Sequence, residues 1–174
     1  PTDSNYSCFN TGGVEVEVGE FLHGLVRMIK PIRILETGTH KGISASYFGL
    51  AIRENGGGMI DTIEFDPQHY KDVQDLWRNL GIEAFINLHR MKTQDFVIKE
   101  NYDLVLLDTE PDQRFAELVR VFPYVNSGGI IIIHDLHSHM SQEAVPDAKY
   151  PGWPFGTLPQ EMINWVKDGQ LRPV

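Results

Sequence analysis

The stretch Ile34–Ser46 most constrains what this chain can fold into. An apolar run ends in Glu36, a turn with Gly38 follows, and a helical pattern begins near Gly42. This order is typical of a parallel α/β sheet, which binds its ligands at the carboxyl ends of its strands. Gly38 would let a ligand approach the main chain closely, and we expect Gly42 to let the helix pack tightly against the strand.

The carboxylate of Glu36 argues against a dinucleotide ligand. The fingerprint G-x-G-x-x-G would need a glycine at this position. A carboxylate would repel a pyrophosphate, whereas it suits a cationic ligand. The alternative is a generic strand–turn–helix in which the acid occurs by chance.

The composition limits the classes of partner. With 174 residues, 41% of them hydrophobic and 22% charged, the chain suggests one domain, residues 1–174. No apolar run approaches the roughly 20 residues that cross a bilayer, and no signal peptide is visible. The net charge of −9 argues against nucleic acid. The single cysteine, Cys8, fits a reducing cytoplasm. We therefore expect a cytoplasmic protein that binds a small molecule, with a homo-oligomer left open.

Hydrophobic periodicity predicts alternating strands and helices. The predicted strands are 32–35, 59–65, 84–88, 104–107 and 130–133, and the predicted helices are 18–29, 43–51, 66–80, 93–99, 115–122 and 159–167. Ser127–Gly129 should form a turn, and Leu171 should open a sixth strand. Residues 1–12 are interpreted as a loose arm and 137–158 as a substrate-side loop. The pattern predicts an α/β fold with a doubly wound, mostly parallel sheet of Rossmann-like type, in which the last strand could be lacking.

Four predicted strands end in or beside an acid, namely Glu36, Glu64, Asp108 and Asp135. These acids should share one rim of the sheet, where ligands bind. Glu64 could accept both hydroxyls of a ribose. The alternative is an ordinary strand-end acid, but Asp66 already serves as the predicted cap of the next helix.

Three motifs carry a family resemblance: Glu36-x-Gly38-x-x-x-Gly42, Glu64 within residues 63–67, and Thr93-Gln94-Asp95. In these motifs the chain resembles the class I S-adenosylmethionine (SAM) methyltransferases, especially the catechol and caffeoyl-CoA O-methyltransferase group and related small-molecule methyltransferases. The resemblance implies SAM as the cofactor. The cofactor-binding residues that we infer from it are Glu36, Gly38, Thr39, His40, Ser44, Glu64, Phe65, Thr93, Gln94 and Asp108.

The same resemblance implies a metal held by Asp108 and Asp135. The residue that follows the second aspartate is normally asparagine, but Leu136 stands here and cannot bind a metal. Pro111 occupies the place where the catechol branch often has a lysine base. Two parts of the metal-dependent mechanism are therefore absent from the sequence.

Three histidines surround Asp135 and could replace those parts. His134, His137 and His139 could bind a divalent ion or accept a proton near pH 7. A mixed site of Asp108, Asp135 and His137 would accept Mg²⁺ or another divalent metal. The alternatives are a solvated loop with chance histidines and, for His134, a buried core histidine.

These observations together predict a SAM-dependent methyltransferase that acts on a small molecule, at a hydroxyl oxygen. We expect its catalytic residues among His134, Asp135 and His137. Aromatic residues of the loop, such as Trp153 and Phe155, could wall the acceptor site or pack onto their own domain. Two alternatives stay open: a metal-dependent α/β hydrolase or hydroxylase, and a non-catalytic SAM-binding domain.

Overall fold

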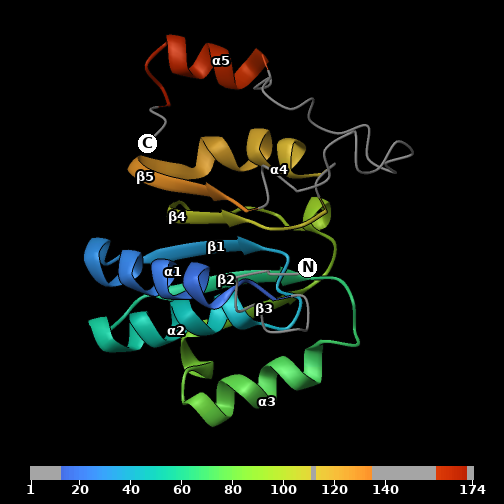
Figure 1. Cartoon of the computed structure of the whole chain (residues 1–174). Coiled ribbons are helices and arrows are strands. Elements are labelled where there is room, and N and C mark those ends of the chain that lie inside the picture. The colour runs from blue at the N-terminus through green and yellow to red at the C-terminus, as the bar shows by residue number, and fades with distance from the viewer. Residues whose placement is uncertain (1–12, 111–112, 135–159, 172–174) are drawn as a thin grey trace, which may run out of the picture.

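Five parallel strands form one sheet in the order β3-β2-β1-β4-β5 (Figure 1). A computed structural model of the chain describes residues 13–110, 113–134 and 160–171. The strands are β1 (Arg33–Thr37), β2 (Met59–Glu64), β3 (Ile86–Arg90), β4 (Tyr102–Leu107) and β5 (Val125–Ile133). The helices are α1 (Val16–Ile29), α2 (Ile43–Asn55), α3 (Tyr70–Leu80), α4 (Arg114–Val121) and α5 (Gln160–Lys167).

The helices cover both faces of the sheet. Because successive side chains of a strand point to opposite faces, Ile34 packs with α1, α2 and α3, whereas Leu35 packs on the side of α4 and α5. On the second face Trp165 of α5 stacks on Phe122 with ring centroids 4.2 Å apart. Figure 1 shows α3 at the β3 end of the sheet and α4 and α5 at the β5 end. The predicted doubly wound α/β fold is confirmed.

The predicted bounds of β1 and β3 were wrong by one or two residues. Ile32, predicted as the first residue of β1, lies before the strand and is exposed. The predicted strand 84–88 begins later, at Ile86, because Glu83–Phe85 form a 3-10 turn. Apolar residues in these turns resemble strand residues when only the sequence is considered.

Two helix predictions were also wrong in part. Asp66 does not cap α3: its Oδ1 accepts the backbone N–H of Gln68 at 2.9 Å, and the helix begins only at Tyr70. The predicted helix over 93–99 is a single 3-10 turn, Thr93–Asp95. In both places a short turn precedes or replaces the helix.

The predicted turn at Ser127–Gly129 is an irregularity inside β5. Tyr102 pairs with Val125, but Leu104, two residues further along β4, pairs with Ile130. Between these two pairs, β5 therefore contains three more residues than β4. A bulge of this kind explains why polar and glycine residues occur within an otherwise apolar strand.

Gly42 serves a different packing contact from the predicted one. A Cβ atom at this position would lie 3.0 Å from the Trp77 ring and 3.1 Å from Val73. Both neighbours belong to α3, so the absence of a side chain at Gly42 allows α3 to pack closely here, rather than the preceding strand. Gly42 also begins α2 with a left-handed backbone, φ 70°.

Several predictions lie outside the described residues: the arm 1–12, Asp135, the loop 137–158 and the part of the sixth strand after Leu171. Leu171 itself belongs to no strand. Among the helices that the structure describes, none is long and apolar enough to cross a membrane.

Candidate functional site

A pocket of about 1120 Å³ lies at the carboxyl ends of the parallel strands. Its walls come from the turn after β1, the end of β2, the Thr93 turn, the end of β4 and one side of α4. Nine of the ten predicted cofactor-binding residues line it: Gly38, Thr39, His40, Ser44, Glu64, Phe65, Thr93, Gln94 and Asp108. The tenth, Glu36, is fully buried beneath the wall.

The turn after β1 is held against two neighbouring strands. The backbone N–H groups of Gly38 and Thr39 both donate to the Ile63 carbonyl, at 3.0 and 3.1 Å. Gly38 has φ 84°, and a Cβ atom there would lie 2.3 Å from the carbonyl oxygen of Asp108. Only glycine fits, because the turn passes directly over the end of β4.

Glu36 places a carboxyl group under this turn. The hydroxyl of Thr62 donates to its Oε2, and Thr62 in turn lies 2.6 Å from the hydroxyl of Thr39. Within the described residues, Oε1 makes no hydrogen bond of ordinary distance and angle. Burial raises the pKa of Glu36 to about 7, and the nearby carboxylates of Asp108 and Glu64 add to the rise.

The hydroxyls of Ser44 and Thr62 act against this rise in the pKa of Glu36. Even so, the carboxyl group stays close to half-ionised near neutral pH. A buried carboxyl group can respond to a cationic group in the pocket above it by losing its proton. This arrangement suits the cationic ligand that the sequence predicts.

Glu64 is fixed at the end of β2 by two backbone donors. Its Oε2 accepts the N–H of His40 at 2.6 Å, and its Oε1 accepts the N–H of Asp66 at 2.8 Å. His40 adopts φ 45°, a left-handed conformation that is uncommon outside glycine. Each carboxylate oxygen can still accept a second donor, so Glu64 can hold a ligand hydroxyl without losing its own support.

The Thr93–Asp95 turn forms the far wall of the pocket. Arg120 of α4 donates to the carbonyl of Thr93 and so ties this turn to the helix. Phe65 is 63% exposed and Met91 is 37% exposed, and both line the pocket. Exposed apolar side chains beside a polar turn are suited to contact the flat face of a ring.

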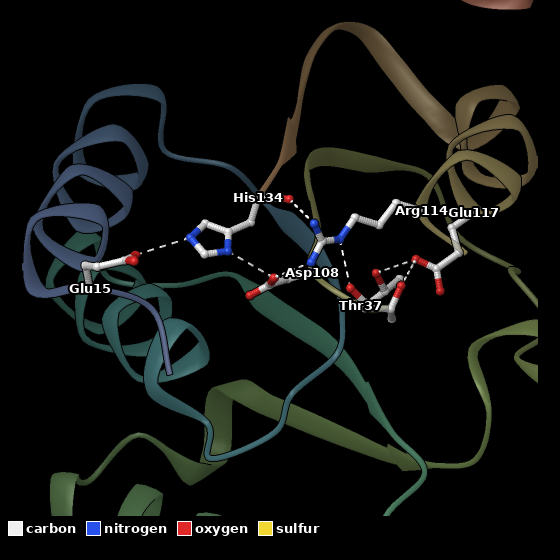
Figure 2. A network of polar contacts seen from close by, with 7 residues as sticks. Glu15, Thr37, Asp108, Arg114, Glu117 and His134 are labelled. Atoms are coloured by element: carbon white, nitrogen blue, oxygen red, sulfur yellow. Dashed lines mark hydrogen bonds and ion pairs between the residues drawn. The ribbon is translucent and has the colours of Figure 1, made fainter. Parts of the chain in front are cut away.

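Asp108 lies in a network that reaches across the end of the sheet (Figure 2). Its Oδ1 lies 3.1 Å from Nδ1 of His134 and 3.4 Å from a guanidinium nitrogen of Arg114. The other ring nitrogen of His134 lies 3.3 Å from Oε2 of Glu15, just before α1. The predicted catalytic residue His134 is therefore placed between two carboxylates.

The same network continues to the end of β1. Arg114 donates through Nε to the carbonyl of Thr109 at 2.8 Å. The hydroxyls of Thr109 and Thr37 donate to Oε2 of Glu117, at 2.8 and 2.9 Å (Figure 2). Glu117 is only 6% exposed. Polar groups from β1, from the turn after β4 and from α4 thus hold one another in place.

The described residues do not fit a divalent metal. Among them, no group of three or more histidine, cysteine or acidic side chains could hold one. Of the residues predicted to bind a metal, Asp108 and His134 lie in the described part of the chain. The carboxylate of Asp108 already contacts Arg114, and the imidazole of His134 lies between Asp108 and Glu15. Asp135, His137 and His139 lie outside the described part, so the roles predicted for them stay predictions.

The sequence did not point to Glu15, Thr37, Arg114, Glu117 or Arg120. One signal was available: Arg114, Glu117 and Arg120 recur every third residue, which places them along one side of α4. All three line the pocket. Glu15 carries no such signal, because its partner is distant in the sequence.

Comparison with known proteins agrees with this geometry. Residues 35–136 match a protein family described as "Methyltransferase domain". A provisionally assigned O-methyltransferase of Mycobacterium sp. (strain KMS) is 29% identical over 127 residues, which cover 71% of this chain and 57% of that protein. This chain therefore spans little more than half the length of that curated relative.

Solved structures share the fold. The O-methyltransferase TomG from Streptomyces achromogenes, in complex with SAM, is 21% identical with a TM-score of 0.66 and matches 80% of this chain and 63% of its own. The Podospora anserina methyltransferase PaMTH1, bound to S-adenosylhomocysteine (SAH), is 19% identical with a TM-score of 0.68 and matches 92% and 67%. At these identities the likeness shows the fold alone.

Proposed function

The chain belongs to this methyltransferase domain family, and on that premise we propose that it transfers the methyl group of SAM to a hydroxyl oxygen of a small molecule. One observation carries the proposal. A single pocket at the strand ends is lined by the Gly38 turn, by the fixed carboxylate of Glu64 and by the Thr93–Asp95 turn.

The donors and acceptors around the pocket fit SAM from end to end. The methionine part would lie at the Gly38 turn, above the buried carboxyl of Glu36, which suits a cation. The ribose hydroxyls would bind Glu64, and the adenine would lie beside Thr93 and Gln94. The relatives bound to SAM or SAH support this cofactor for the same fold.

When bound, SAM would supply an electrophilic methyl group on a sulfonium centre, with the neutral thioether of SAH as the leaving group. The chain's own residues then mainly orient the acceptor and exclude water. Asp108 would accept a hydrogen bond from the acceptor hydroxyl, since it lines the pocket at the end of β4. The base that takes the proton stays predicted among His134, Asp135 and His137.

Asp108 already pairs with Arg114, so the proposed methyl transfer uses no metal. A small-molecule acceptor is favoured over nucleic acid by the net charge of −9. A cytoplasmic location and a homo-oligomer stay predictions.

Calorimetric titration with SAM and SAH tests the cofactor. Each charge-assisted hydrogen bond contributes about 1.5–3 kcal/mol, so Glu64→Ala should weaken SAM binding more than tenfold. The exposed Glu20 on α1 gives a matched control, because Glu20→Ala should leave the affinity unchanged. No binding to the folded wild-type chain would refute the cofactor assignment.

A panel of hydroxyl-bearing small molecules then tests the transfer, with methylated products detected by mass spectrometry. SAM binding without any product would favour a non-catalytic SAM-binding domain. SAM-independent turnover that EDTA abolishes would favour the metal-dependent hydrolase or hydroxylase.

A further inference from the structure

Arg114 is held at three points beside the pocket. Its Nε donates to the carbonyl of Thr109 at 2.8 Å, one terminal nitrogen donates to the carbonyl of His134, and the other lies 3.4 Å from Oδ1 of Asp108. The side chain is only 7% exposed. With every nitrogen of the guanidinium engaged, this positive charge has a fixed place between the ends of β4 and β5.

The carboxylate of Asp108 receives a second donor from the other side. Nδ1 of His134 lies 3.1 Å from the same Oδ1 atom, and Glu15 supports the far side of that ring. Arg114 from α4 and His134 from the end of β5 thus both contact the carboxylate of Asp108 before any ligand binds (Figure 2).

A divalent metal bound to Asp108 would stand within a few ångströms of this guanidinium. Two fixed positive groups repel strongly in a partly buried site, where water screens them little. Arg114 cannot swing away without leaving two backbone carbonyls short of their donor. The sequence agrees, because Leu136 offers no metal ligand after Asp135.

The geometry points to Arg114 as the built-in cation of the Asp108 site, a positioning residue that lets this site orient its acceptor without a divalent metal. This inference rests on the proposed function for the identity of the acceptor step. Its exclusion of metal from Asp108 is independent of that function.

The test is a titration of the full chain with Mn²⁺, in which the electron paramagnetic resonance signal of the free ion measures binding. Mg²⁺ is added as a competitor. The wild type should show no stoichiometric site that depends on Asp108. Arg114→Gln removes the charge, and its Mn²⁺ affinity should rise at least tenfold over that of the wild type. Arg114→Lys keeps a positive charge and should still exclude the metal. Arg78→Gln, on the exposed side of α3, is the matched control and should behave as the wild type.

Tight Mn²⁺ binding by the wild type that Asp108→Asn abolishes would overturn the inference, whatever the variants do. A folded Arg114→Gln chain with no gain in Mn²⁺ affinity would overturn it too. SAM binding measured on the same samples separates the two proposals. Loss of methyl transfer after EDTA treatment, with SAM affinity unchanged, would contradict the metal-free site but not the methyltransferase function.

Discussion

The carboxylate of Glu15 and the imidazole of His134 lie 3.3 Å apart, from Oε2 to Nε2, although 119 residues separate them in the sequence. The contact joins the start of α1 to the end of β5 (Figure 2). Since Asp108 holds the other ring nitrogen, the orientation of His134 depends on one carboxylate from each side.

Replacing Glu15 by glutamine should disturb the chemistry more than the stability. The side chain of Glu15 is about one-third exposed, so the contact should contribute at most about 1 kcal/mol to the free energy of unfolding. We expect methyl transfer to slow by about tenfold, less than the roughly 100-fold cost of losing a general base, while SAM affinity stays the same. Single-turnover rates and calorimetry measure the two effects, with Glu20→Gln as the control. A parallel loss of SAM affinity would contradict a role confined to His134.

The fold could be predicted because its signals are local. The unbroken apolar run 104–107 predicts a central parallel strand, and the run 130–133 predicts a further strand; they lie in β4 and β5, respectively. The bulge at Ser127–Gly129 could not be predicted, since it depends on which residues of β4 the strand pairs with.

The residues of the candidate site likewise divide into those that local motifs predict and those that depend on distant contacts. Gly38, Glu64 and Thr93 belong to short motifs at strand ends, and the structure brings them to one pocket. Glu15 and Glu117 act through partners that are far away in the sequence, Glu117 through Thr37 of β1. Only the packing of α1 and α4 against the strand ends creates these contacts.

Glu36 should make the stability depend on pH. Its pKa rises from 4.5 to about 7 on folding, so between these values the folded chain holds a proton that the unfolded chain has lost. Its contribution is fully present below about pH 4.5 and is lost as the pH rises through 7, a change of roughly 3 kcal/mol.

Glu36→Gln lacks this titration and should therefore show a free energy of unfolding that falls less between about pH 5 and 8. Urea denaturation of the wild type and the variant at several pH values measures the difference. Identical pH profiles would show that burial does not raise the pKa of Glu36. Glu20→Gln, at an exposed site of α1, should reproduce the wild-type profile.

SAM binding should release protons from the same carboxyl group. A cationic ligand above Glu36 favours its ionised form, so about half a proton per SAM should leave near pH 7, where the group is about half-protonated. Calorimetry in buffers with different ionisation enthalpies counts these protons. Glu36→Gln should abolish the release, and release that persists in this variant would assign it to another group.

Gly38→Ala should disrupt the site far more than the same substitution at Gly56. Both glycines have a left-handed backbone, with φ 84° and 89°. A Cβ atom at Gly38 would lie 2.3 Å from the carbonyl oxygen of Asp108, whereas one at Gly56 would meet nothing within 4 Å. Gly56→Ala should therefore cost only about 1 kcal/mol of backbone strain. Gly38→Ala adds a clash between two loops, so we expect a loss of about 2–5 kcal/mol and no detectable SAM binding. Urea denaturation and calorimetry measure both effects, and equal losses in the two variants would show that the turn can move away from β4.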